Sequence, residues 1–351
     1  MASPYSYVSY IKLPQTTKLP VLLLMPMYLS TLMLDYVLIK NEKRLSITPL
    51  QLRSFIGLYH FMLPLFFDSR YDFANISFML QPWILAIQIF FMTESHLTLT
   101  EWLLMMIKVA TFQDETPNTE SDQSIRLQGI KKLVRGIAKL GFNRIALQGL
   151  LPADLSILLS MRFYSPKAMF YTYVLAMRIY CMMSMVDVWM GILQIVFLVR
   201  FQDLFHNPFI SISPKDFWNR RWNRAVSRMF HRFMFSKVSA KKGKQAKHQS
   251  FLMSSPTVCG LGVFFVSGLF HDFMIAAATR ILTFEMTLFF MIHGIAVALE
   301  VNLFRKRIPP YSMTSRILCH VLTTLFFVTT GRLFLSPILR NQVFLRIANW
   351  F

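Results

Sequence analysis

The sequence predicts an all-α protein that crosses a membrane several times. Of its 351 residues, 54% are hydrophobic and only 15% are charged, whereas about a quarter of the residues in a soluble globular chain are charged. The apolar residues gather in runs close to the roughly 20 residues that a helix needs to cross a bilayer. This composition argues against a soluble enzyme, a disordered protein and a secreted disulfide scaffold.

Nine apolar runs predict about eight to ten transmembrane helices, some of them tilted or re-entrant. They cover residues 20–39, 52–67, 74–93, 97–112, 145–161, 167–200, 255–280, 283–304 and 315–338. The first run lacks the basic segment and cleavage site of a signal peptide, so we expect it to be retained. We expect one integral membrane domain over residues 1–351, residing as a multi-pass protein in the endoplasmic reticulum membrane. The three cysteines lie inside apolar runs and are expected to be packed free thiols.

The charge of the chain is strongly basic, with 37 Lys and Arg against 17 Asp and Glu and a net charge of +20. In a membrane protein this excess is typical of cytosolic loops beside anionic headgroups, so we expect membrane lipid and no nucleic acid as a partner. Residues 113–144, residues 201–250 and the interruption that begins at Arg305 are therefore expected to face the cytosol. Two apolar runs separate each of these interruptions from the next, which agrees with that placement.

The segment from Ser213 to Phe233 predicts a cytosolic amphipathic helix at the membrane surface. Pro214 directly after Ser213 is typical of a helix start. On a helical wheel one face is apolar and comprises Trp222, Val226, Met229, Phe230 and Phe233. The opposite face is cationic and comprises Arg220, Arg224, Arg228 and Arg232.

Two asparagines, Asn219 and Asn223, fall within or at the edge of the predicted apolar face. An amide buried without a hydrogen bond costs about 1–3 kcal/mol, so each either caps or bridges a helix or serves a substrate. The chain has no carboxylate from Phe217 through His271, and ten cations lie between Arg220 and Lys247. This basic segment is either a solvated loop or an electrostatic funnel for an anionic, phosphate-bearing cosubstrate.

The run from Thr257 to Thr279 contains the adjacent ionisable residues His271 and Asp272. An ionisable pair inside a span is costly and by default indicates function. Imidazole suits a general base because its pKa lies near neutrality and desolvation keeps it uncharged. Ser267 lies one turn earlier on the same face. The structural alternative is a histidine that only bridges two helices.

Other histidines are weaker candidates. His293 and Glu300 are seven residues apart and share a helix face, so they form either a second catalytic element or an interhelical polar contact. His60, His206 and His320 are isolated in the sequence and are expected to be structural. No group of His, Asp and Glu has the spacing of metal ligands, so we predict no metal site.

Two motifs together resemble the membrane-bound O-acyltransferase superfamily, and most closely its wax-synthase-like branch. The first is Ser213-x-x-Asp216-Phe-Trp-x-Arg-Arg-Trp-Asn223, and the second is Ser267-Gly-Leu-Phe-His271-Asp. The close match covers residues 200–300, which we expect to be the catalytic region. Asp272 stands where this branch often has Glu, and Asn219 stands where it often has Gly.

The resemblance implies a catalytic role for the intramembrane histidine, which maps to His271. It implies a second active-site role for the residue that closes the first motif, which maps to Asn223. Sterol- and diacylglycerol-acylating relatives have a pattern that would favour Asn219 instead. The expected substrate- and CoA-binding residues are Trp218, Asn219, Arg220, Arg221, Trp222, Arg224 and Ser267. Asp272, His293 and Glu300 are possible secondary residues.

The resemblance further implies an O-acyltransferase that esterifies a lipophilic alcohol, either a long-chain alcohol in wax ester synthesis or a sterol. Acyl-CoA would be the cosubstrate, with no permanently bound cofactor. An acetyltransferase acting on a terpenoid or other secondary metabolite is the alternative within the family. Alternatives of another class are a proton- or ion-coupled transporter, in which His271, Asp272 and Glu300 line a path, and a non-catalytic membrane scaffold. The oligomeric state is left open.

Overall fold

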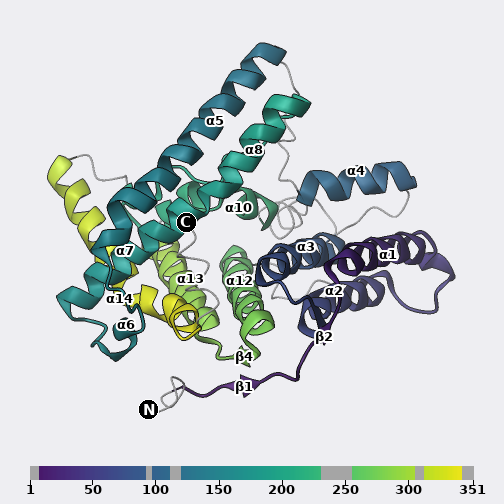
Figure 1. The fold of residues 1–351 in the computed structure, drawn as a ribbon, viewed down its shortest axis with the longest axis horizontal. Coiled ribbons are helices and arrows are strands. Elements are labelled where there is room, and N and C mark those ends of the chain that lie inside the picture. The colour runs from purple at the N-terminus through teal and green to yellow at the C-terminus, as the bar shows by residue number, and fades with distance from the viewer. Residues whose placement is uncertain (1–7, 92–96, 111–119, 231–254, 305–311, 342–351) are drawn as a thin grey trace. The chain divides into compact units, whose positions relative to one another are not determined.

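The computed structural model describes residues 8–91, 97–110, 120–230, 255–304 and 312–341. These residues are mostly helical, with four strands of two residues each, which confirms the predicted α class (Figure 1). The chain divides into two compact units. One contains Val8–Gln113 and Phe270–Thr283, and the other contains Asp114–Leu269 and Phe284–Phe351. Helix α12, Pro256–Thr279, contributes residues to both.

The unit that contains the N-terminal helices is built from four helices and two small strand pairs. The helices are α1 (Val21–Lys40), α2 (Pro49–Phe66), α3 (Asp72–Phe91) and α4 (Leu99–Ala110). Strand β1 (Ile11–Lys12) pairs antiparallel with β4 (Ile281–Leu282), and β2 (Thr17–Lys18) pairs in parallel with β3 (Phe67–Asp68). A short 3₁₀ turn, Glu42–Arg44, follows α1. Helix α2 begins at a capping box in which Thr48 and Gln51 satisfy each other's backbone N–H groups, with Pro49 in the first turn.

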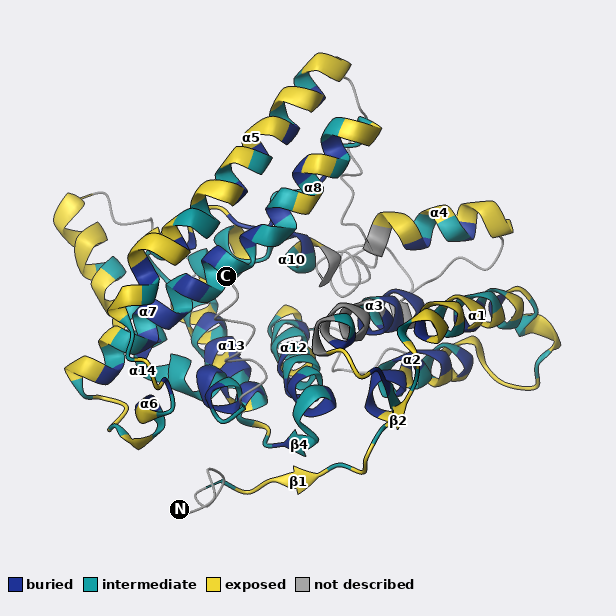
Figure 2. Ribbon diagram, viewed as in Figure 1, coloured by how far each residue is buried: buried dark blue, intermediate teal, exposed yellow. Residues whose placement is uncertain are grey.

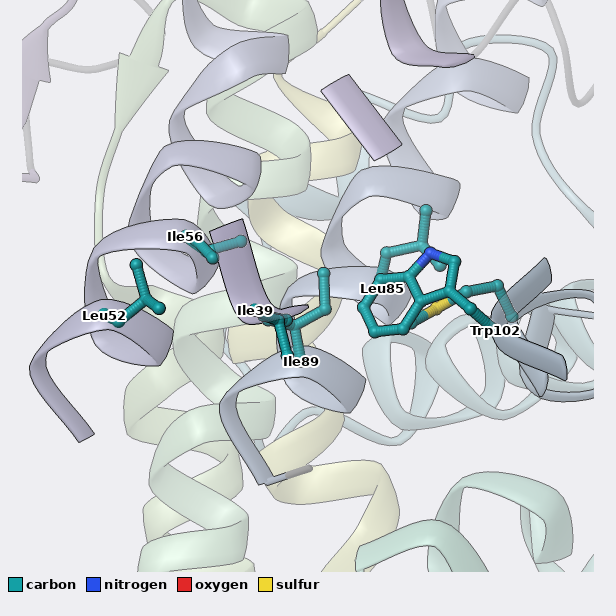
Figure 3. Close-up of a cluster of buried hydrophobic side chains, with 7 residues drawn as sticks. Ile39, Leu52, Ile56, Leu85, Ile89 and Trp102 are labelled. Atoms are coloured by element: carbon teal, nitrogen blue, oxygen red, sulfur yellow. The ribbon is translucent and has the colours of Figure 1, made fainter. Parts of the chain in front are cut away.

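The core of this unit is a cluster of seven buried side chains from all four of its helices. It comprises Ile39, Leu52, Ile56, Leu85, Ile89, Trp102 and Met106 (Figure 3). A second cluster holds the end of α12, where Phe270 contacts Trp83 and Phe273 contacts Phe61 edge to face. These aromatic contacts fix the helix segment that carries His271.

The other unit contains the remaining helices and the predicted amphipathic segment. Its long helices are α5 (Asp122–Phe142), α7 (Pro166–Met182), α8 (Ser184–Phe197), α13 (Glu285–Leu303) and α14 (Met313–Leu339). Its short elements are the π turn Asn143–Leu147, the 3₁₀ turn Gln148–Leu150, α6 (Ile157–Ser160), the 3₁₀ turn Pro208–Ile210, α9 (Pro214–Asp216), the π turn η5 (Phe217–Arg221) and α10 (Arg224–Phe230). Helix α14 packs against both α7 and α13.

Five helical stretches among the described residues are long and apolar enough to cross a membrane. They are Val21–Lys40, Pro166–Phe197, Pro256–Thr279, Glu285–Leu303 and Met313–Leu339. The expected span over residues 145–161 is wrong: this run contains Gly149 and Pro152 and forms only turns and the four-residue α6. Proline lacks the backbone N–H that a continuous helix needs there. The count of eight to ten spans stays a prediction.

Candidate active site

The first motif folds as two short helical pieces with a break, and the predicted continuous helix through Asn223 is wrong. The Ser213 side chain caps α9 by accepting from the backbone N–H of Asp216 at 3.1 Å. The next turn is a π turn, closed where the N–H of Trp222 donates to the Phe217 carbonyl at 2.9 Å. Trp222 is then extended, and Asn223 adopts a left-handed conformation with φ 39°.

Asn223 is suited to this break because asparagine tolerates the left-handed region and caps helices well. Its Oδ1 accepts from the backbone N–H of Val226 at 3.4 Å, and its carbonyl accepts from Ser227 at 3.0 Å, so it begins α10. This capping role is the structural alternative that the sequence left open. It uses the oxygen of the amide and leaves the amide N–H donors for other partners. Asn219 lies on the exposed side of the π turn.

Glu300 of α13 holds the start of the motif. One carboxylate oxygen accepts from the Ser213 hydroxyl at 2.7 Å, and the other accepts from the backbone N–H of Lys215 at 2.9 Å. The carboxylate therefore satisfies an otherwise unpaired N–H in the first turn of α9, where a negative charge is also favoured.

His293 of α13 holds the other end of the motif. The indole N–H of Trp218 donates to His293 Nδ1 at 3.1 Å, and His293 Nε2 lies 2.9 Å from the hydroxyl of Thr330 in α14. The imidazole is fully buried, and the rings of Phe289, Phe326 and Phe327 surround it. The shared face that the sequence predicted for His293 and Glu300 is confirmed, and both residues contact the same motif.

The tryptophans of the motif serve as packing anchors. Trp222 stacks on Phe217 with ring centroids 5.2 Å apart and meets Phe205 edge to face at 4.9 Å. Trp218 meets Phe264 of α12 edge to face at 5.6 Å. These contacts fix the direction in which the π turn presents Asn219 and Arg220.

The two arginines of the motif, Arg220 and Arg221, and Arg224 directly after it differ in their surroundings. Arg221 donates from Nε to Asp216 Oδ2 at 2.7 Å and from Nη1 to the Asn207 carbonyl at 3.2 Å, so it stabilises the loop itself. Arg220 is exposed and Arg224 is half-buried. Among the described residues, no carboxylate forms an ion pair with either of these two side chains.

The second motif lies on α12, close to α13. Gly268 allows this approach, because a Cβ added there would lie 2.5 Å from the Cα of Thr287. Ser267 and His271 are half-buried, and Asp272 is only 2% exposed. His271 and Asp272 belong to the unit of the N-terminal helices, whereas Ser267 and the first motif belong to the other unit. The expected meeting of His271 with Asn223 stays a prediction.

The remaining histidines have identifiable surroundings. His60 is not isolated: its Nε2 pairs with Asp35 of α1, and both side chains are only 1% exposed. The sequence reasoning missed this pair, although each residue is a rare ionisable group inside an apolar run. His320 Nδ1 donates to the Ser211 carbonyl at 3.0 Å, and His206 is exposed. The three cysteines are free. The described ranges contain no group of three or more His, Cys, Asp or Glu that could hold a metal ion.

The comparisons with known proteins agree with the motifs. Residues 201–292 match the model of the membrane bound O-acyl transferase family. The chain is 32% identical over 174 residues to "Probable long-chain-alcohol O-fatty-acyltransferase 1" of Arabidopsis thaliana, a match that covers 48% of each protein. It is 31% identical over 144 residues to the long-chain-alcohol O-fatty-acyltransferase of Simmondsia chinensis, a match that covers 40% of each.

The matches therefore span 48% and 40% of the length of these two curated relatives. They confirm the resemblance to the wax-synthase-like branch that the two motifs predicted. Both motifs lie inside the matched residues.

Proposed function

We propose that this chain, whose residues 201–292 match the membrane-bound O-acyltransferase family, transfers a fatty acyl group from acyl-CoA to the hydroxyl of a long-chain alcohol. The observation that carries the proposal is the matched segment. It contains a histidine in a helix long and apolar enough to cross a membrane, and an asparagine motif held in place by a neighbouring helix. The names of the similar proteins supply the long-chain alcohol as acceptor. The endoplasmic reticulum membrane is the proposed location.

His271 is proposed as the general base. Its neutral imidazole would take the proton of the alcohol while the alcohol oxygen attacks the thioester carbonyl carbon. The C–S bond then breaks, the ester is released, and the thiolate of CoA takes the proton back from the imidazolium. Such a step contributes about 10²–10⁴-fold to the rate. The acyl group passes directly from CoA to the alcohol in this reaction, without an acyl-enzyme intermediate, so no nucleophilic serine or cysteine is required.

Asn223 is proposed to bind the oxygen that becomes negatively charged during the attack. Its Oδ1 already accepts from Val226, which would orient the amide N–H donors in a fixed direction. Preorganised donors of this kind contribute about 10²-fold or more to the rate. Asn219, on the exposed side of the π turn, is the alternative residue for this role.

The cosubstrate is proposed to bind through its phosphates to Arg220 and Arg224, which no described carboxylate neutralises. Arg221 would contribute indirectly, because its guanidinium is engaged by Asp216. The alcohol would enter laterally from the bilayer. Exclusion of water from the site would then suppress hydrolysis of the thioester.

The test is an ester-synthesis assay on microsomes that contain the full chain. Labelled long-chain acyl-CoA and acetyl-CoA are each offered with fatty alcohols, sterols and a terpenoid alcohol. We expect wax ester from long-chain acyl-CoA and fatty alcohol. We expect at least a 10²-fold loss for His271→Ala, and full activity for the matched control His206→Ala, whose side chain is exposed.

Product only from acetyl-CoA and the terpenoid alcohol would favour the acetyltransferase. Wild-type activity in His271→Ala would refute the general base. If no ester forms from any pair while the protein is inserted and folded, acyl transfer itself is refuted and the transporter becomes the leading function.

A further inference from the structure

Helices α5 and α8 form an antiparallel pair whose backbones touch (Figure 1). Gly129 and Gly136 of α5 and Gly191 of α8 lie in the contact. A Cβ added to Gly191 would lie 2.9 Å from both the Gly129 carbonyl oxygen and the Leu133 nitrogen. Small residues that allow close backbone approach are typical of helix contacts in membranes.

Polar and charged side chains also lie in this contact. Asp187 of α8 is 3% exposed and forms ion pairs with Arg135 at 3.3 Å and Lys139 at 3.6 Å. Gln194 is 1% exposed and donates to the Ile125 carbonyl at 3.0 Å. Lys132 is 5% exposed and donates to the Phe201 carbonyl at 2.8 Å. Three of the cations of α5 are thus paired, Arg135 and Lys139 with Asp187 of α8 and Lys132 with the segment that follows α8.

The outer faces of the pair are exposed (Figure 2), and large apolar side chains lie on them. On α5, Leu127, Ile130, Val134 and Ile137 are each about half exposed or more. On α8, Trp189 and Val196 are also exposed, on the side that faces away from α5. A water-soluble helix pair buries its apolar residues and exposes its polar ones. This pair instead buries Lys132, Asp187 and Gln194 in the contact and exposes large apolar side chains on two opposite sides.

We propose that α5 crosses the bilayer beside α8 and that the acyl chains of the lipid cover these outer faces. At about 1.5 Å per residue, its 21 residues span about 32 Å, close to the roughly 30 Å of the hydrocarbon core. Composition alone does not identify α5 as a span because it is rich in Lys and Arg. Two exposed cations, Arg126 and Lys131, lie beside the apolar strip, and the crossing requires their long side chains to reach along the helix toward the anionic headgroups.

The sequence predicted two spans before residue 201, at residues 145–161 and 167–200, and the first of these is not a continuous helix. If α5 crosses the membrane, it takes the place of that span. The start of α5 and the end of α8 lie together, where Glu120 and Arg200 form an ion pair at 2.9 Å with both side chains partly exposed to water. Glu120, Ser121 and residues 201–230 then share one side of the membrane. Residues 148–165 lie on the other side. The proposal does not depend on acyl transfer.

The test is the labelling of single cysteines by a membrane-impermeant maleimide in sealed microsomes, before and after permeabilisation. The background is the full chain with Cys181, Cys259 and Cys319 replaced by alanine. Three exposed positions are probed, and they are Gln123, Gly149 and His206. We expect Gln123→Cys and His206→Cys to be labelled from one side and Gly149→Cys from the other. Labelling of Gln123→Cys and Gly149→Cys from the same side would overturn the crossing.

A second measurement tests the lipid contact. A nitroxide at Val134→Cys, in vesicles of phosphatidylcholine and phosphatidylglycerol, should collide more with oxygen than with a water-soluble nickel chelate. The nitroxide at Gln123→Cys is the matched control and should show the opposite preference. Leu127→Cys provides a replacement if Val134→Cys does not fold. A preference for the nickel chelate at residue 134, or protection from both reagents, would overturn the proposal.

Discussion

The indole N–H of Trp218 donates a hydrogen bond to Nδ1 of His293 across 3.1 Å. An Nδ1 that accepts carries no proton, so the proton of the neutral ring is on Nε2. Thr330 donates its single hydroxyl proton to the Phe326 carbonyl at 2.7 Å and must therefore accept from His293 Nε2. Both ring nitrogens are thus occupied, and we infer that His293 is a neutral positioning residue that connects α13, α14 and the first motif.

Replacing Thr330 with valine removes the acceptor for His293 Nε2 and leaves a buried N–H unpaired. We expect a loss of about 1–3 kcal/mol in the free energy of unfolding. The measurement is the thermal or denaturant unfolding of the detergent-solubilised chain. The rate of acyl transfer should fall only to the extent that the first motif is displaced, because His293 positions this motif.

Thr329→Val is the matched control for this substitution. The Thr329 hydroxyl also donates a hydrogen bond to the backbone of its own helix, to the Leu325 carbonyl at 2.9 Å, but it forms no hydrogen bond with any described histidine. Its replacement should change the stability by less than about 0.5 kcal/mol. Equal effects of the two substitutions would contradict the assigned tautomer.

Glu300→Ala should detach the start of the motif from α13. The Ser213 hydroxyl and the Lys215 N–H would both lose their acceptor, and we expect a cost of about 1.5–3 kcal/mol because the acceptor is charged. Lys215→Ala is the control, since it keeps the backbone N–H and removes only an exposed side chain. Unfolding midpoints of the two variants should differ clearly. If they coincide, Glu300 does not hold the motif.

Much of this arrangement follows from spacing in the sequence. The seven-residue interval between His293 and Glu300 places them on one helix face, and the structure connects that face to Ser213 and Trp218. The apolar run lengths likewise predict five of the long helical stretches. Local periodicity is sufficient for such features because a regular helix repeats every 3.6 residues.

Other features depend on contacts distant in sequence and could not be predicted this way. The helical wheel through Asn223 fails because the extended Trp222 and the left-handed Asn223 interrupt the helix after the π turn, and nothing in the local spacing of residues requires that break. The pair Asp35 and His60 forms between different helices, 25 residues apart. The basic composition of α5 indicated a cytosolic loop, because the carboxylates that neutralise it belong to other segments, Asp187 of α8 and Asp203.

Gly191→Ala should separate α5 from α8. The new methyl group would lie 2.9 Å from backbone atoms of Gly129 and Leu133, which do not yield as a flexible side chain would. We expect a loss of about 1–3 kcal/mol from overpacking. Gly141→Ala in α5 is the control, because no atom lies within 4 Å of the added methyl group, and it should be neutral or stabilising by up to about 1 kcal/mol. Unfolding curves of both variants provide the comparison.

Substitutions of Asn223 separate its structural role from its proposed chemical role. Glycine accepts the left-handed conformation of this residue and is an acceptable cap, so Asn223→Gly should cost only a few tenths of a kcal/mol. Alanine loses the cap and adds left-handed strain, so Asn223→Ala should cost about 2–3 kcal/mol. The two stabilities are compared by unfolding.

Neither variant retains the side-chain amide of Asn223, so their activities test whether that amide binds the oxyanion. If the amide N–H groups bind the developing oxyanion, Asn223→Gly should be folded nearly as well as the wild type but about 10²-fold slower in ester synthesis. Asn223→Ala should then be both unstable and slow. Wild-type activity of the folded glycine variant would show that Asn223 only shapes the loop, and the second active-site role would pass to Asn219, which is exposed and follows Trp218 in the π turn.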